Sequence, residues 1–178
     1  MSKEEVYVED VIKIDRLTLK AYSYEDQEKM IQLLTNEKVK ETYMIPDFKT
    51  KEEAILMFKK LQVFSYSEEH YELGIYKDNE LIGFINDVEI AGDKIEIGYV
   101  IEPKFQNRGY ATEVLKAAID DLFKRGFNKI IAGAFESNKA SYRVMEKCGM
   151  KRIDKEEDIT YHNRVQHCIY YGITKGDI

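Results

Sequence analysis

Residues 94–126 read KIEIGYVIEPKFQNRGYATEVLKAAIDDLFKRG, and this stretch decides the fold. Over residues 94–101 apolar side chains alternate with other residues, which is the period of a strand with one packed face. From residue 111 the apolar positions recur at helical spacing, and Gly126 stands where a C-cap glycine belongs. The stretch therefore predicts a strand, a short loop around Gly109, and a long amphipathic helix.

The loop reads QNRGYA at residues 106–111 and predicts an anion site. Gly109 permits close approach of the backbone, and a helix start offers unpaired N–H groups and a positive dipole end. Two better-known phosphate loops are absent, because the chain has neither GxxxxGK[ST] nor a GxGxxG after a strand. Backbone N–H groups of residues 107–112 could wrap a pyrophosphate, with charge from Arg108 and a polar side chain from Gln106. A plain strand–helix turn is the alternative.

QNRGYA also matches [QR]xxGx[GA], the signature of the Gcn5-related N-acetyltransferase (GNAT) superfamily. Residues 138–152, NKASYRVMEKCGMKR, resemble the last helix and following strand of its ribosomal-protein N-acetyltransferase (RimJ/RimL-like) branch. Residues 16–26, RLTLKAYSYED, resemble the first strand and helix of that branch. The resemblance implies an α/β fold with a mixed, mostly antiparallel central sheet of about seven strands. Helices would flank both faces, and the fourth and fifth strands would splay apart.

The composition is that of an ordinary soluble protein, and the length of 178 residues predicts one domain over residues 1–178. No run approaches the roughly 20 apolar residues of a membrane span. The N-terminus, MSKEEVYVED, is unlike a signal peptide, so we expect a cytoplasmic protein without a membrane partner. The net charge of −6 argues against a general nucleic-acid surface.

Cysteine and histidine give no sign of a metal site. Cys148 and Cys168 are the only cysteines, and their spacing suggests neither zinc nor a disulfide framework, so we expect two buried small hydrophobes. His70, His162 and His167 lack companions, and structural roles are expected for them.

The other elements follow from local patterns. In the first half of the chain we expect a strand over 16–20, a helix opening at Ser23 with Asp26 as capping partner, and helices over 37–43 and 52–64. Strands over 71–77 and 80–90 would follow, joined by an Asp78-Asn79 turn. The second half would add a strand over 129–135, a helix over 138–148, and a final hairpin of 150–158 and 160–173 around residues 161–163. By the resemblance, the loop around Pro46 would border the acceptor pocket. Its lining would include Tyr43, Met44, Ile45 and Phe48, for which an ordinary hydrophobic lid is the alternative.

The resemblance implies transfer of an acetyl group from acetyl-CoA to a primary amine by direct attack. The acceptor would be a protein N-terminus, a small amine such as a polyamine, or an amine-bearing toxin or antibiotic, and relatives suggest a possible homodimer. Backbone groups of Val100 and Ile101 would meet the thioester and pantetheine, and Asn138 would cap a helix and bond a pantetheine amide. The pyrophosphate would rest on Gln106, Asn107, Arg108, Gly109, Tyr110, Ala111 and Thr112. Arg143 and Lys147 would meet the adenosine phosphates or form a solvated helix face.

Two candidate catalytic residues follow from the same expectation. Glu96, on the strand face opposite Ile95 and Ile97, is the first candidate to accept the amine proton. A solvated strand carboxylate is its alternative, with Glu102, Glu136 or water as other acceptors.

For the leaving thiolate, the tyrosine that many relatives carry seven residues after the helix-opening asparagine is replaced here by Met145. Ser141 is the remaining hydroxyl candidate, unless it only bonds the backbone of the first helical turn. Its neighbour Tyr142 fits a surface or cofactor contact better. The missing tyrosine also keeps open a rival function, a non-catalytic acyl-CoA binding or regulatory module.

Overall fold

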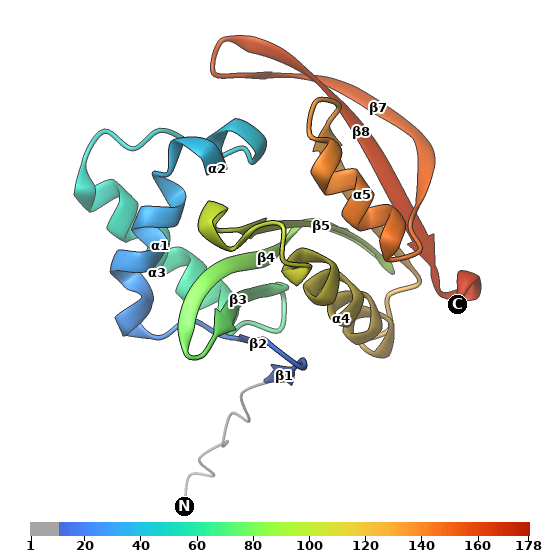
Figure 1. Cartoon of the computed structure of the whole chain (residues 1–178), viewed down its shortest axis with the longest axis horizontal. Helices are drawn as coiled ribbons and strands as arrows, with labels where there is room; N and C mark the ends of the chain where they lie inside the picture. The colour runs from blue at the N-terminus through green and yellow to red at the C-terminus, as the bar shows by residue number, and fades with distance from the viewer. Residues whose placement is uncertain (1–10) are drawn as a thin grey trace, which may run out of the picture.

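The computed structural model describes residues 11–178; the expectation for the acidic N-terminus lies outside them. The strands are β1 (Ile12–Lys13), β2 (Thr18–Lys20), β3 (Glu72–Lys77), β4 (Glu80–Ala91), β5 (Lys94–Ile101), β6 (Lys129–Phe135), β7 (Lys151–Tyr161) and β8 (Arg164–Thr174). The helices are α1 (Gln27–Leu34), α2 (Glu37–Thr42), α3 (Lys51–Ser65), α4 (Tyr110–Lys124) and α5 (Lys139–Lys147), with single 3-10 turns at Tyr24–Asp26, Pro103–Phe105 and Lys175–Asp177. Figure 1 shows their arrangement.

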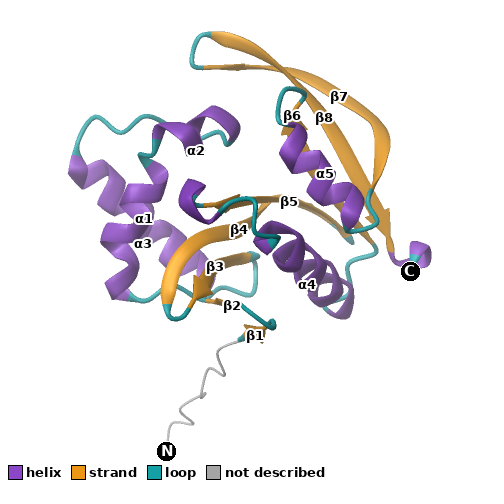
Figure 2. Cartoon of the chain, viewed as in Figure 1, coloured by secondary structure: helices purple, strands orange, loops and turns teal. Residues whose placement is uncertain are grey.

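All of the strands join one sheet in the order β1-β2-β3-β4-β5-β6-β8-β7 (Figure 2). The pairing is antiparallel everywhere except between β5 and β6, which are joined by α4 and run parallel. The prediction of a mixed, mostly antiparallel sheet is confirmed. The sheet has eight strands rather than about seven because the two-residue β1 pairs with β2.

Helices cover both faces of the sheet, as expected. On one face α4 packs its apolar side against alternate strand residues, including Ile95 and Ile97 of β5, and Met145 of α5 joins the same core. On the other face α1, α2 and α3 bury a second core against Leu81 and Phe84 of β4. Because side chains of a strand alternate between faces, one sheet buries apolar residues on both sides.

Two tight turns confirm the predicted hairpins. Asp78 and Asn79 have φ values of 48° and 66°, and His162 and Asn163 have φ values of 47° and 59°. Two consecutive left-handed residues fit a two-residue turn that matches the twist of its strands. The second turn uses only these two residues, so β7 continues to Tyr161 instead of ending at residue 158.

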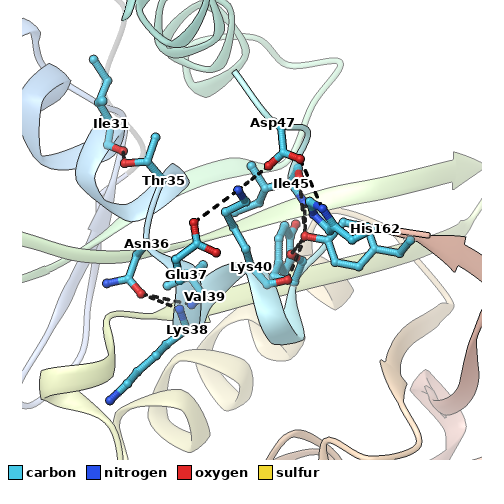
Figure 3. A network of polar contacts seen from close by, with 12 residues as sticks. Ile31, Thr35, Asn36, Glu37, Lys38, Val39, Lys40, Ile45, Asp47 and His162 are labelled. Atoms are coloured by element: carbon cyan, nitrogen blue, oxygen red, sulfur yellow. Dashed lines mark hydrogen bonds and ion pairs between the residues drawn. The ribbon is translucent and has the colours of Figure 1, made fainter. Parts of the chain in front are cut away.

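The tip of the β7–β8 hairpin is hydrogen-bonded to α2 and the loop that follows it. The Tyr161 hydroxyl donates to the Lys40 carbonyl oxygen at 2.8 Å, lies 3.1 Å from the carbonyl oxygen of Tyr43, and accepts from the Ile45 backbone N–H at 3.3 Å. Figure 3 shows the side chain of Asp47 between Lys40 and His162, with which it forms ion pairs. Segments more than a hundred residues apart in sequence are thereby joined.

Replacing Tyr161 with Phe should lower the free energy of unfolding by roughly 1–3 kcal/mol, because it removes one hydroxyl and leaves backbone groups of α2 without their partner. Urea unfolding measures this loss, and hydrogen exchange should show faster exchange in residues 40–45. Tyr24→Phe is the control, since the Tyr24 side chain is 85% exposed. Equal stability of the two variants would mean that the hairpin contact contributes nothing.

Glu72 of β3 is a buried carboxyl on the face covered by α1 and α3. It is 4% exposed and accepts a hydrogen bond from the Tyr22 hydroxyl at 2.6 Å. Burial raises the pKa of Glu72 from 4.5 to about 8. The folded protein therefore keeps this carboxyl protonated at neutral pH.

The raised pKa of Glu72 determines how the free energy of unfolding changes with pH. Between pH 4.5 and about 8 the unfolded chain releases the Glu72 proton and the folded protein retains it, so this group makes stability fall as pH rises, by roughly 1.4 kcal/mol per unit. Glu72→Gln should remove that fall, so the variant should gain stability over the wild type at pH 8 but not at pH 4.5. Urea unfolding at both pH values, with the exposed Glu52→Gln as control, measures it. An equal difference at the two pH values would show that Glu72 is ionised in the folded protein.

Candidate active site

The cavity at the centre of the molecule lies where β5 and β6 stop pairing. Their hydrogen-bonded register ends at Ile97 opposite Ala132. Beyond that point β5 pairs with β4 alone and β6 pairs with β8 alone. The predicted splay between these strands is therefore present, and a cavity of about 490 Å³ opens there. It is lined by both strands and by the starts of α4 and α5.

The loop before α4 has the geometry of an anion cradle. Gly109 caps the helix with φ 82°, a left-handed conformation that glycine adopts without strain. The first hydrogen bond of the helix runs from the Glu113 N–H to the Gly109 carbonyl oxygen at 3.1 Å. The N–H groups of Tyr110, Ala111 and Thr112 precede that bond, and all three residues line the cavity.

Arg16, which is far from this loop in the sequence, holds it in place through side-chain contacts. Its guanidinium donates to the Arg108 carbonyl oxygen and to a Glu113 carboxylate oxygen, each at 2.7 Å. It also stacks over the Tyr110 ring, 4.5 Å from the centroid. From the sequence, Arg16 is expected only at the start of a strand, because no local pattern signals a partner 92 residues away.

Most residues predicted to bind a cofactor meet at this cavity. They are Val100, Ile101, Gln106, Asn107, Gly109, Tyr110, Ala111, Thr112 and Asn138. The Gln106 side-chain amide already donates a hydrogen bond within the protein, to the Ile101 carbonyl oxygen at 2.9 Å. Arg108 is exposed instead, and its guanidinium donates to the Lys104 carbonyl oxygen at 3.3 Å. Arg143 and Lys147 of α5 border the same cavity.

The point where β5 and β6 stop pairing, after Ile97 and Ala132, is called the fork. Glu96 lies one residue before Ile97, on the sheet face opposite α4. Its carboxylate pairs with the Lys155 ammonium at 3.2 Å, and its side chain is 12% exposed. It is therefore neither a solvated strand carboxylate nor a side chain that lines the cavity. Glu102 pairs with Lys29 at 2.9 Å, and Glu136 is exposed after β6. The identity of the proton acceptor stays a prediction.

Ser141 lines the cavity from the first turn of α5. The Asn138 side chain caps that helix by accepting from the Ser141 N–H at 3.3 Å, so its predicted capping role is confirmed. The Ser141 hydroxyl lies 3.1 Å from the hydroxyl of Tyr99, a strand residue that the sequence analysis did not select. Met145 is fully buried in the core, whereas the Tyr142 hydroxyl donates to the Glu136 carbonyl oxygen at 3.1 Å.

Two glycines mark the fork on the face opposite α4. A Cβ at Gly98 would lie 2.9 Å from Tyr43, and one at Gly133 would lie 2.6 Å from Tyr170. The rings of these tyrosines therefore occupy the space that side chains would fill. Of the loop predicted to border an acceptor, Tyr43 lines the cavity.

The other three loop residues lie elsewhere. Met44 is exposed, Ile45 is buried, and Phe48 packs against the core of α1 and α3.

The cysteines and histidines have structural surroundings. Cys168 is buried, and Cys148 is partly buried against the α4 core, where burial raises the pKa of its thiol to about 11. His70, His162 and His167 each lie beside a carboxylate, and the hydrogen bond that His167 donates to Asp158 raises the pKa of His167. Within residues 11–178 no group of three or more His, Cys, Asp or Glu side chains is arranged to hold a metal ion. None of the described helices is long and apolar enough to cross a bilayer.

The site thus combines a sheet that forks beside α4, a glycine-capped helix start at the fork, and one cavity that joins the two. A family model described as an acetyltransferase (GNAT) domain matches residues 16–151. The chain belongs to the GNAT acetyltransferase family. The predicted superfamily is thus confirmed, and this GNAT protein is an enzyme of the acetyltransferase class.

Known relatives agree with this assignment. The uncharacterised N-acetyltransferase YnaD of Bacillus subtilis is 30% identical over 143 residues, which cover 79% of this chain and 82% of the relative. A GNAT-family acetyltransferase from Bacillus anthracis has a TM-score of 0.79 at 29% identity, covering 93% of this chain and 99% of that one. The ribosomal L7/L12 alpha-N-protein acetyltransferase RimL shares the fold, with a TM-score of 0.81 at 17% identity over 93% of this chain and 94% of its own. The fold neighbours therefore include the ribosomal-protein branch that the sequence resembles.

Proposed function

We propose that the protein is an acetyl-CoA-dependent N-acetyltransferase that acetylates a primary amine by direct attack. The observation that carries the proposal is the single cavity that joins the β5–β6 fork to the helix start at Gly109. An extended amide chain needs free strand edges, and a pyrophosphate needs clustered N–H donors. This cavity offers both, at the two ends of one continuous space.

The residues around the cavity fit the parts of acetyl-CoA. The N–H groups of Tyr110, Ala111 and Thr112 would receive the pyrophosphate, at the positive end of the α4 dipole. Unpaired edges of β5 beyond Ile97 would bond the pantetheine amides, with Asn138 facing them from α5. Arg143 and Lys147 border the same cavity and would add positive charge near the adenosine phosphates.

The chain's own groups then have three tasks. The fork orients the thioester carbonyl toward the face where Tyr43 and Tyr170 stand, so that an amine can approach it. Water, or Glu96 after release from Lys155, accepts the proton that the attacking amine loses. Ser141 donates a hydrogen bond to the sulfur as the carbon–sulfur bond breaks.

Two classes of primary amine are candidate acceptors. The RimL neighbour suggests a protein N-terminus, and a small amine such as a polyamine or an amine-bearing toxin is the alternative. Calorimetry with acetyl-CoA, followed by thiol-release assays with N-terminal peptides, polyamines and other amines, distinguishes them. Binding with turnover on one class supports the proposal. Tight binding without turnover on any acceptor would favour a non-catalytic acyl-CoA binding module, and no binding would overturn the proposal.

Ser141→Ala should leave the acetyl-CoA affinity within about twofold and lower kcat by about tenfold to a hundredfold, because the variant loses one donor to the developing thiolate. Calorimetry and steady-state thiol release measure the two effects separately. Ser67→Ala, just after the end of α3, serves as the matched control, because Ser67 is also half-buried but does not line the cavity. An unchanged kcat would remove Ser141 from the mechanism and leave the fold assignment intact.

Gly109→Val should weaken acetyl-CoA binding by more than about tenfold. A side chain at this left-handed position strains the loop, and its Cβ would come within 3.3 Å of Arg16. Gly126→Val is the control, because Gly126 also has a positive φ, 101°, but nothing within 4 Å of its Cβ position. Both variants should lose stability, whereas only the first should lose affinity by calorimetry. Wild-type affinity in Gly109→Val would mean that the pyrophosphate lies elsewhere.

A further inference from the structure

Two hydroxyl groups from different elements meet inside the cavity. Tyr99 projects from β5 and Ser141 from the first turn of α5, and both line the space at the fork. The Tyr99 hydroxyl lies 3.1 Å from the Ser141 hydroxyl and 3.1 Å from the Ser141 carbonyl oxygen. Both contacts therefore tie β5, which would border the thioester, to α5, which carries the proposed hydrogen-bond donor to the thiolate.

The two hydroxyls have one proton each, and this limits how they can bond. In one arrangement Tyr99 donates to the Ser141 carbonyl oxygen and Ser141 donates to the Tyr99 oxygen. In the other, Tyr99 donates to the Ser141 hydroxyl oxygen, and the Ser141 proton is free to point into the cavity. The heavy atoms need not move, because only the hydroxyl protons rotate.

We propose that Tyr99 is a positioning residue, which donates to Ser141 and so directs the Ser141 proton at the sulfur of the departing CoA. This inference rests on the proposed acetyl transfer. A hydroxyl that accepts one hydrogen bond becomes a stronger donor in the next, so the Tyr99–Ser141 pair stabilises a thiolate better than Ser141 alone. The missing tyrosine at Met145 is thereby replaced from another element of the fold.

The surroundings of Tyr99 favour a donor that keeps its proton. Burial raises the pKa of Tyr99, and the nearby Cys148 thiol, whose pKa is also raised by burial, carries no charge at neutral pH. Arg143 and Lys147 of α5 are the cations that border this cavity. Burial holds the pKa of Tyr99 above its ordinary value of 10, so the tyrosine remains neutral beside Ser141 at neutral pH.

The reaction balances without a proton from either hydroxyl. The amine nitrogen forms a bond to the acetyl carbon, the carbon–sulfur bond breaks, and the electron pair stays on the sulfur. The attacking amine gives one proton to its acceptor, and the thiolate later takes one proton from solvent. Tyr99 and Ser141 only donate hydrogen bonds while the negative charge is on the sulfur, and both retain their protons.

A double-mutant cycle of Tyr99→Phe and Ser141→Ala tests the pair, because Phe keeps the ring and removes only the hydroxyl. In the wild-type background Tyr99→Phe should lower kcat about tenfold with little change in KM for acetyl-CoA. In the Ser141→Ala background the same change should lower kcat less than about twofold. Tyr171→Phe is the matched control, since its hydroxyl also bonds α5, at Glu146, but Tyr171 does not line the cavity. An equal loss in both backgrounds would show a purely structural role and overturn the proposal.

A second measurement needs no acceptor. Calorimetry compares CoA with desulfo-CoA, which lacks the sulfur, at a pH near the thiol pKa of about 8.5. Tyr99→Phe and Ser141→Ala should each reduce the preference for CoA by about threefold or more, and the double variant should lose no more than Ser141→Ala alone. An unchanged preference in Tyr99→Phe would overturn the Tyr99 proposal alone. If neither compound binds the wild-type protein, the proposed function fails as well.

Discussion

The loss of hydrogen bonding between β5 and β6 is the constraint on which the rest of this structure depends. The parallel register holds only from Lys94 opposite Lys129 to Ile97 opposite Ala132. Up to that point the strands belong to one sheet and one core under α4. Beyond it, each strand is held by its outer neighbour, β4 or β8, and the inner edges face a cavity. A sheet that paired throughout would have no room between these strands.

The two faces of the fork are built by different means. On the α4 side, a glycine-capped helix start and α5 close the space, and Arg16 fixes the loop between strand and helix. On the other side, Tyr43 and Tyr170 fill the space left by two glycines. Tyr43 is held at its hydroxyl by Asn86 at 2.6 Å and at its backbone by the β7–β8 hairpin. Tyr43 is thus anchored by Asn86 of β4 and by Tyr161 of the C-terminal hairpin.

The reaction chemistry proposed here relies on neutral groups more than on charged ones. Glu96 is paired with Lys155, and Glu72 stays protonated because it is buried. Tyr99 and Ser141, whose hydroxyl groups lie 3.1 Å apart, line the cavity instead. In a half-buried space a neutral donor costs little desolvation, whereas an unpaired charge costs much. Hydrogen bonds from hydroxyls are therefore a suitable way to stabilise a transient thiolate.

The sequence by itself determined the elements and the loop. Period-two and helical spacing of apolar residues gave β5 and α4, Gly109 marked the helix start, and the Asp78-Asn79 turn predicted a hairpin, because each signal depends on neighbours within a few residues. Only the tertiary structure brought Arg16 to the loop, Lys155 to Glu96, and Tyr99 to Ser141. These partners lie 92, 59 and 42 residues apart. Side-chain pairing over such sequence separations depends on how strands and helices pack, and it cannot be predicted from local periodicity.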